Sequence, residues 1–198
     1  METGQKNGLL AASLLAVVST TLALLGFLET NEGFGPYHIE NGQRVYTAYP
    51  DPGYGTKLPT ICNGHTRGVT MQTTATLEQC RAWLSEDVQW AKERVGKCLT
   101  HTITQKQFDA LTSFEFNTGL FCFTQMKTYI NNGQCYLAAN EFNNSPQIDR
   151  KTGKPRVLNG KVVMKSTTSN GIPLRGLERR RKEEREMFED DCAKWEVK

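Results

Sequence analysis

The chain has 198 residues, of which 38% are hydrophobic and 23% charged, with a formal net charge of +3. This composition is typical of globular proteins, and the length is enough for one domain with a hydrophobic core. We expect one domain preceded by an N-terminal segment. Because acidic and basic residues are interspersed and the excess of positive charge is small, the composition gives no support for a nucleic-acid partner.

An uncharged run from Asn7 to Leu28 opens the chain, and it is long enough to cross a bilayer as a helix. Small and hydroxyl-bearing residues dilute its apolar content, which lowers the cost of leaving the membrane. They are Gly8, Ala11, Ala12, Ser13, Ala16, Ser19, Thr20, Thr21, Ala23 and Gly26. We predict a releasable anchor over residues 1–28 and a domain over residues 29–198; a cleaved signal peptide and a permanent anchor stay open as alternatives.

The candidate catalytic residues follow in a region rich in Gly and Pro. The alternating segment 44–49, the turn 50–59 and the β-prone run 60–62 predict a β-hairpin. Asp51 lies at the top of its first strand and Thr60 at the start of its second, so both point into one cleft if an upstream acid faces them. Cleavage of a glycosidic bond needs two such carboxyl groups. One carboxylic acid protonates the leaving oxygen, and one carboxylate stabilises positive charge or activates water.

These motifs resemble the phage-lysozyme family of muramidases. In that family a Glu-Gly pair ends a helix, an Ala-Tyr-x-Asp strand follows, and a Thr-Ile-(Gly or Cys)-x-Gly-His-Thr strand closes the site. The resemblance places Asp51 and Thr60 on the family's Asp and Thr. The remaining matches of the second strand are Ile61, Gly64, His65 and Thr66. The interval between Asp51 and Thr60 is longer than in short members, which a turn can absorb.

Two glutamates are candidates for the acid. Glu32 is followed by Gly33, as the family pattern requires, although the extra residues 34–43 separate this pair from the hairpin. Glu40 is closer in number but lacks a following Gly and lies in a loop-like Glu-Asn-Gly. We assign the acid to Glu32 and keep Glu40 as the alternative.

Helical patterns follow the hairpin. A Thr-based capping signal near Thr76 precedes a helix to about Lys97, which we expect to face the core. A second helix runs from Lys106 to Asn117, and its residues resemble the family's Q-x-D-A-L and F-N-x-G signatures. Asn117 is either a helix-ending cap or a hydrogen-bond partner of a substrate sugar.

The chain continues with two short helices, 121–129 and 135–142, divided by an Asn-Asn-Gly turn. The polar stretch 143–171 is interpreted as a solvated insertion, with contact to glycan or peptide stems as the alternative. A final helix, 176–188, resembles the family's G-L-x-x-R-R-x-x-E signature. Its run of charges predicts a solvated helix face.

All six cysteines lie beyond the apolar run, and this even count indicates disulfides and an oxidising compartment. A zinc site is disfavoured because there is no Cys-x-x-Cys pair and there are only three histidines. The spacings do not select a connectivity; our prediction pairs Cys62 with Cys80, Cys122 with Cys135, and Cys98 with Cys192. A Cys62–His65 nucleophile pair is disfavoured, since positions three apart on a strand face opposite sides.

The resemblance implies an α+β lysozyme-like fold, with a small β-hairpin lobe and a larger helical lobe after the N-terminal transmembrane helix. It implies a peptidoglycan hydrolase that cleaves the β-1,4 bond between N-acetylmuramic acid and N-acetylglucosamine and lyses the host cell for phage release. Glu32 is the expected general acid, Asp51 the ionised partner, and Thr60 the residue that holds water. Inverting hydrolysis requires the two carboxylates to lie about 6.5–9.5 Å apart. We expect no metal or organic cofactor.

The apolar run and the hairpin together resemble the signal-anchor-release class of endolysins. This resemblance implies a monomer held in the host inner membrane through residues 7–28, with its catalytic domain in the periplasm until release. Two other functions stay open. A lytic transglycosylase would use one Glu and no water-activating partner, which Asp51 and Thr60 argue against. A non-catalytic, membrane-tethered wall-binding protein would keep the cleft without turnover.

Overall fold

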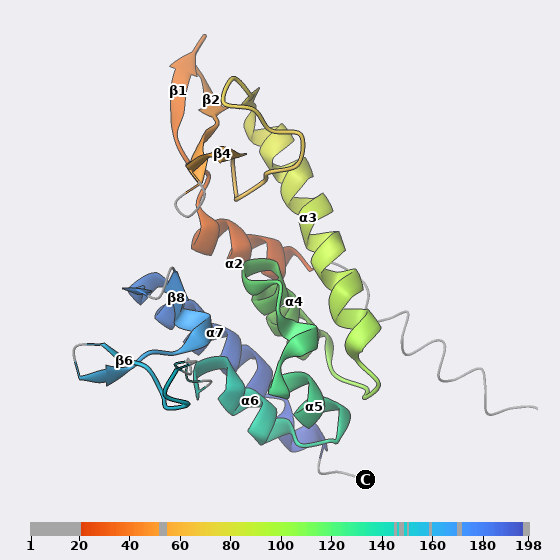
Figure 1. Cartoon of the computed structure of the whole chain (residues 1–198). Coiled ribbons are helices and arrows are strands. Elements are labelled where there is room, and N and C mark those ends of the chain that lie inside the picture. Colours follow the sequence, from red (N-terminus) through yellow and green to blue (C-terminus); the bar gives the residue numbers. More distant parts are fainter. Residues whose placement is uncertain are drawn as a thin grey trace, which may run out of the picture.

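The computed structural model describes residues 21–51, 55–144, 146, 149, 151–158, 160–169 and 172–195. A small lobe of strands lies at one end and a larger lobe of helices at the other, and one long helix, α3 (Leu77–Cys98), runs between them (Figure 1). The lysozyme-like α+β architecture is therefore confirmed. Residues 7–20 of the predicted membrane segment lie outside the described residues.

The small lobe contains two antiparallel sheets. One has the order β1-β2-β5 and the other pairs β3 with β4. Their bounds are β1 (Tyr37–Glu40), β2 (Gln43–Thr47), β5 (Thr74–Ala75), β3 (Tyr49–Asp51) and β4 (Gly55–Thr60). A hairpin carries Asp51 and Thr60 as predicted, but its strands are β3 and β4, which lie mostly within the predicted turn 50–59, while most of the predicted first strand, 44–49, is in β2 and pairs with β1 and β5. Thr60 therefore ends the second strand and does not begin it. The reason is a tight turn: Cys62 has a φ of 53° and Ile61 pairs with His65.

The predicted helices after the small lobe are confirmed with their caps. In α3 and in α4 (Gln105–Thr118) a Thr hydroxyl accepts from the third helical N–H, while a Gln side chain at that position accepts from the Thr backbone. These two capping boxes satisfy backbone donors that the first turn leaves unpaired. The left-handed Gly119, with a φ of 64°, caps the end of α4. Asn117 lies within the last turn, so its predicted role as the cap was wrong.

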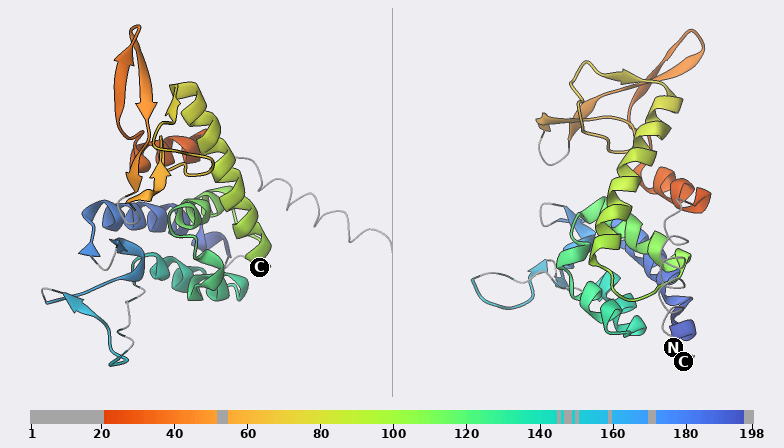
Figure 2. Two further views of the ribbon diagram at one scale, coloured as in Figure 1. Left: turned by 45° about the horizontal axis from the view of Figure 1, so that its top comes forward. Right: turned by 90° about the vertical axis from the view of Figure 1, so that its right-hand side faces the viewer.

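The large lobe packs aromatic and aliphatic side chains between helices α4, α5, α6 and α7, with Phe108, Phe114, Phe142 and Phe188 all buried. Its remaining elements are η1 (Phe121–Phe123), α5 (Gln125–Asn131), α6 (Cys135–Asn144), η2 (Lys165–Thr167), α7 (Arg175–Glu189) and η3 (Cys192–Trp195). Two short hairpins, β6 (Val157–Leu158) with β7 (Lys161–Val162) and β8 (Thr168–Ser169) with β9 (Ile172–Pro173), project from the helices (Figure 2).

The disulfides correct two of the three predicted pairs. Cys62 is bonded to Cys80 as predicted, but Cys98 is bonded to Cys122 and Cys135 to Cys192. Helix α4 returns the chain past the end of α3, which brings η1 beside Cys98. The C-terminal η3 packs against α6, where Cys135 is the first residue. Both pairings depend on how the helices pack, which cysteine spacing does not encode.

Helix α2 (Leu22–Glu32) brings the end of the predicted membrane segment into the folded domain. Leu24 and Leu28 are fully buried against Leu84 and Val88 of α3. The predicted boundary at residue 28 therefore falls inside a helix that packs on the domain. Over the ranges described above, no helix is both long and apolar enough to cross a bilayer.

A buried polar cluster fixes the start of α2. The Thr21 hydroxyl accepts from the N–H of Leu24 and donates to Asp109 at 2.6 Å, and Gln105 donates to the other Asp109 oxygen at 2.8 Å. Asp109 is only 4% exposed, and its burial raises the pKa of its carboxyl. The two hydrogen bonds and the nearby Lys92 act to lower this pKa but do not cancel the effect of burial. The helix is thus held by hydrogen bonds at its first turn and by leucines along its length.

Candidate active site

Glu32 is the last residue of α2, where the chain turns sharply toward the small lobe. The following Gly33 has a φ of 68°, a left-handed conformation that favours glycine. From the large lobe, Arg180 of α7 donates through Nη1 to the Glu32 carboxylate. The guanidinium side chain is 2% exposed and the carboxylate side chain 21%, so one face of Glu32 stays accessible.

Arg180 belongs to a buried ionic network. Its Nε donates to Glu184 at 3.0 Å, Arg181 lies 2.8 Å from the same carboxylate, and the Ser113 hydroxyl donates to it at 2.5 Å. Arg181 and Glu184 are fully buried. Burial raises the pKa of the Glu184 carboxyl, although both arginines act to lower it. Burial also lowers the pKa of the Arg181 guanidinium to about 10.

The solvated face predicted for α7 is therefore only part of this helix. Arg179, Lys182 and Glu186 are exposed as expected, but Arg181 and Glu184 lie on the buried side. The buried stripe also includes Phe188, and its members recur at helical spacing. Each buried charge has a partner of opposite sign, which makes its burial tolerable.

Tyr49 connects the remaining candidates. It lies opposite Thr60 in the β3–β4 register, two residues before Asp51 on the same strand. The pKa of the Tyr49 phenol is raised, chiefly by burial and then by the negative charges of Glu32 and Asp51. The phenol is thus within electrostatic reach of both carboxylates. The β3–β4 pairing therefore places Asp51 and Thr60, which is 4% exposed, on the two strands beside this tyrosine.

Two contacts fix this tyrosine and the end of α2. Gly35 has a φ of 71°, and a Cβ on it would lie only 2.7 Å from Cε1 of Tyr49, so the ring packs directly on the glycine backbone. The Asn63 side chain donates to the carbonyl of Gly33. The turn after β4 is therefore joined to the residue that follows Glu32.

Glu40 lies elsewhere. It is the last residue of β1, pairs with Gln43 beside the hairpin turn, is exposed, and has His38 at 3.7 Å as its ionic neighbour. The extra residues after Gly33 form this β1–β2 hairpin. The alternative acid is thus an exposed residue at a hairpin end, whereas Glu32 contacts a buried arginine.

Sequence reasoning missed Arg180 and Tyr49. A signal for Arg180 was available in the helical spacing. Arg180 lies three residues after Leu177 and four before Glu184, so it falls on the same helix face as Leu177 and Phe188, which is the face expected to be buried. Tyr49 is the Tyr of the Ala-Tyr-x-Asp motif, but the motif assigned it no role, because its surroundings depend on Gly35 and on Glu32 from another element.

His65 has a structural role. Its Nδ1 lies 2.8 Å from Asp87, its Nε2 lies 3.0 Å from the carbonyl of Arg67, and its ring stacks on Trp83. Since Cys62 is in a disulfide, the Cys-His nucleophile pair does not exist.

Over the part of the chain that the structure describes, no group of three His, Cys, Asp or Glu side chains could hold a metal ion.

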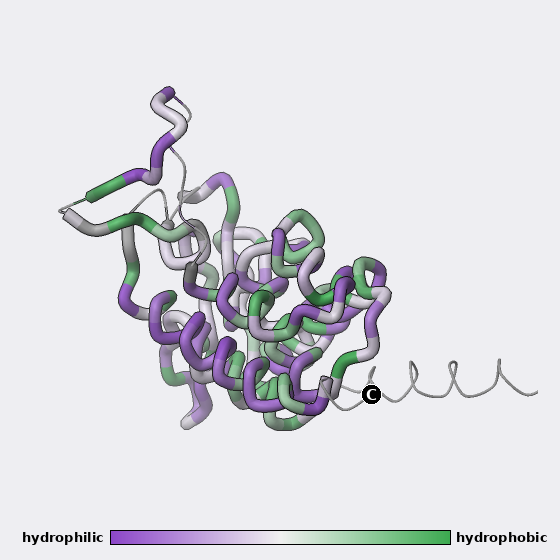
Figure 3. The backbone as a smooth tube through the Cα atoms, turned by 90° about the horizontal axis from the view of Figure 1, so that it is seen from below, coloured by the Kyte–Doolittle hydropathy of each residue, from purple (hydrophilic) through white to green (hydrophobic). Residues whose placement is uncertain are grey.

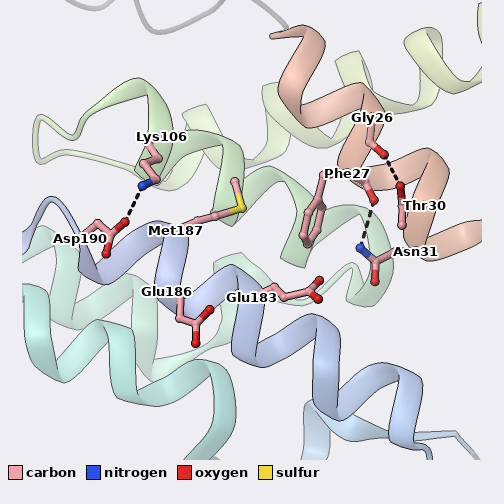
Figure 4. Close-up of a pocket in the computed structure, with 9 residues that line it drawn as sticks. All are labelled: Gly26, Phe27, Thr30, Asn31, Lys106, Glu183, Glu186, Met187 and Asp190. Atoms are coloured by element: carbon pink, nitrogen blue, oxygen red, sulfur yellow. Dashed lines mark hydrogen bonds and ion pairs between the residues drawn. The ribbon is translucent and has the colours of Figure 1, made fainter.

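A groove of about 500 Å³ lies on another side of α2 (Figure 4). Phe27 and Met187 supply its apolar side chains, and an ion pair of 2.5 Å joins Lys106 to Asp190 at one end. Neither Glu32, Asp51 nor Thr60 lines it, so it is separate from the candidate site.

Comparison with known proteins decides the family. The profile of the phage lysozyme family matches residues 40–184. This chain belongs to the phage lysozyme family. The matched range includes Asp51, Thr60 and Arg180, while Glu32 lies just before it.

Curated relatives within the phage lysozymes are endolysins. That of Bacillus phage PZA is 33% identical over 135 residues, which is 66% of this chain and 50% of the relative. That of Acyrthosiphon pisum secondary endosymbiont phage 1 is 32% identical over 132 residues, 66% of this chain and 79% of the relative. The chain thus spans about half the length of the Bacillus phage relative.

Solved structures give the same fold. The muramidase domain of SpmX from Asticaccaulis excentricus has a TM-score of 0.63 at 24% identity, covering 86% of this chain and 97% of that chain. The endolysin from Escherichia coli O157:H7 phage FAHEc1 has a TM-score of 0.60 at 22% identity, covering 87% and 94%. Both likenesses support the two-lobed lysozyme architecture.

The buried network predicts a large difference between neighbouring glutamates of α7. Glu184→Gln leaves Arg181 buried without a counter-charge and should lower the free energy of unfolding by about 3 kcal/mol or more. Glu183→Gln removes only a partly exposed contact with Arg179 and should change it by less than about 0.5 kcal/mol. Denaturant unfolding with the disulfides intact measures both, and equal losses would contradict the network's importance.

Proposed function

We propose that this chain is a peptidoglycan hydrolase, a muramidase that cleaves the β-1,4 bond between N-acetylmuramic acid and N-acetylglucosamine and so lyses the host cell. The observation that carries this proposal is the pairing of β3 with β4, which puts Asp51 and Thr60 on neighbouring strands beside Tyr49, whose ring packs on Gly35, three residues after Glu32. Membership in the phage lysozyme family and the endolysin relatives support the same reaction. We infer that the protein acts as a monomer on the glycan strand.

Each residue has a separate role in this reaction. Glu32 protonates the leaving oxygen as general acid, with its carboxyl oriented by Arg180. The Asp51 carboxylate counters positive charge at the anomeric carbon, and the Thr60 hydroxyl orients the attacking water. The Tyr49 phenol, whose pKa is raised further by burial and by the two carboxylates, is neutral at neutral pH and adds no third negative charge beside them.

We further infer that residues 7–28 first hold the protein in the host inner membrane, with the catalytic domain in the periplasm, and then release it. The uncharged, diluted composition of this run supports release. Leu24 and Leu28 support it as well, because they cannot lie in a bilayer and in the core at the same time. The three disulfides agree with an oxidising compartment.

Three single variants test the assignment of the acid. Glu32→Gln and Asp51→Asn should each lower the rate of lysis about 100-fold or more, because each removes a group that acts on the reacting bond. Glu40→Gln, a matched change at an exposed glutamate, should stay within about twofold. A turbidity assay on permeabilised Gram-negative cells measures all three. Normal lysis by Glu32→Gln with loss in Glu40→Gln would move the acid to Glu40.

A triple variant tests the anchor. Replacing Ser13, Ser19 and Thr20 by Leu should keep the protein in the membrane fraction and delay lysis, because each Leu favours insertion by about 0.3–0.6 kcal/mol. Replacing the same residues by Ala is the matched control and should release normally. Cell fractionation over time measures the outcome. Equal amounts of the Leu and Ala variants in the soluble periplasmic fraction would refute the releasable anchor.

A further inference from the structure

A second hollow, of about 370 Å³, lies where the two lobes meet the long helix. It is lined by Gly64, Thr66 and Arg67 from the loop after β4, by Asp87 and Trp90 from α3, and by Phe116 from α4. Figure 1 shows this loop crossing beside α3, with α4 below it. The lining thus combines two aromatic rings with a charged pair and a stretch of exposed backbone.

Trp90 is held in place although it is not part of the core. Its side chain is 49% exposed, and the guanidinium of Arg94 stacks 4.7 Å from the ring centroid. Arg94 is fixed in turn by an ion pair with the fully buried Glu115 and by a hydrogen bond of 2.9 Å to the carbonyl of Gly119. A large aromatic surface is therefore presented to solvent in a defined position, at little entropic cost for a ligand.

The polar groups of the hollow are also ordered. Asp87 lies 2.8 Å from Nδ1 of His65 and 2.7 Å from Nη2 of Arg67. The Arg67 side chain is 57% exposed and Asp87 is 20% exposed, so both still present hydrogen-bonding atoms to the hollow. The hollow therefore offers an oriented donor and an oriented acceptor beside a flat ring.

The hollow adjoins the candidate active site. Its loop residues begin four positions after Thr60, and Asn63 in this loop donates to the carbonyl of Gly33, the residue after Glu32. Phe116 packs against the cluster in which Leu24 and Leu28 of α2 meet Leu84 and Val88 of α3. The hollow thus shares both its loop and its helix contacts with the segment that carries Glu32, so a polymer bound at Glu32 and Thr60 would meet it a short distance away.

We propose that this hollow binds one N-acetylated sugar ring of the glycan strand, with Trp90 as the stacking platform and Arg67 and Asp87 as hydrogen-bonding partners. The C–H groups on one face of a pyranose are weakly positive and pack on the negative face of an aromatic ring. The ring's hydroxyl and acetamide groups require donors and acceptors at the edge. A volume near the lower end of the usual range of about 300–1,000 Å³ suits a short sugar segment. This inference rests on the proposed function.

Binding of an N-acetylglucosamine hexamer tests the platform. Calorimetric titration is done in the Glu32→Gln background, so that the hexamer is not consumed. Trp90→Ala should raise the Kd about fivefold to tenfold, while Trp90→Tyr keeps an aromatic face and should stay within about threefold. Phe123→Ala, at an aromatic residue that is 81% exposed on η1, is the matched control and should bind normally. With Glu32 intact, Trp90→Ala should raise the KM for cell walls by a similar factor and leave kcat within about twofold.

The outcomes separate this inference from the hydrolase proposal. Equal affinity of the Trp90→Ala and Phe123→Ala variants, or no binding of the hexamer by the parent chain, would overturn the sugar site. Loss of binding in Trp90→Ala in a chain that never cleaves peptidoglycan would support the sugar site and defeat the hydrolase proposal. If Trp90→Ala does not fold, Trp90→Leu replaces it: binding weaker than in Trp90→Tyr supports the platform, and equal binding overturns it.

Discussion

The ion pair between Arg180 and Glu32 is the contact on which the candidate site depends. It joins α7, in the centre of the helical lobe, to the end of α2, where the chain enters the strand lobe. Arg180 is itself fixed by Glu184 and Ser113, so the position of the glutamate is set by the buried core and not by a loop. A charge buried this deeply is costly to leave without its partners. The tube view in Figure 3 shows hydrophilic and hydrophobic stretches alternating along the helices.

Helix α2 relates this site to the N-terminal part of the chain. Its first turn is held by Asp109, its middle by the leucines against α3, and its last residue by Arg180. The same residues, 21–28, belong to a run whose composition also suits a membrane. Since these side chains have only one environment at a time, docking of α2 and placement of Glu32 form a single event. Under the proposal that residues 7–28 first lie in the membrane, this exclusion would let the N-terminal segment control activity.

Local patterns predicted the parts of the fold that local chemistry determines. The capping signal near Thr76 placed the start of α3, and the hairpin pattern placed Asp51 and Thr60 on paired strands. Features that depend on distant neighbours were not predictable in this way. Of the predicted disulfides only Cys62–Cys80 was right, because the other two pairings depend on how the helices pack. The rule that charges face solvent failed at Arg181 and Glu184, where Arg180, Arg181 and Glu184 satisfy one another inside the core.

The central claim is that Glu32 and Asp51 act on one glycosidic bond from opposite sides, with a water held beside Thr60. Proton NMR of the first product released from a β-linked glycan strand tests this claim most directly, because it records the configuration of the new reducing end before it equilibrates. The account predicts that the α-anomer forms first, as a single displacement by water requires. A β-anomer formed first, or an anhydro sugar, would contradict it.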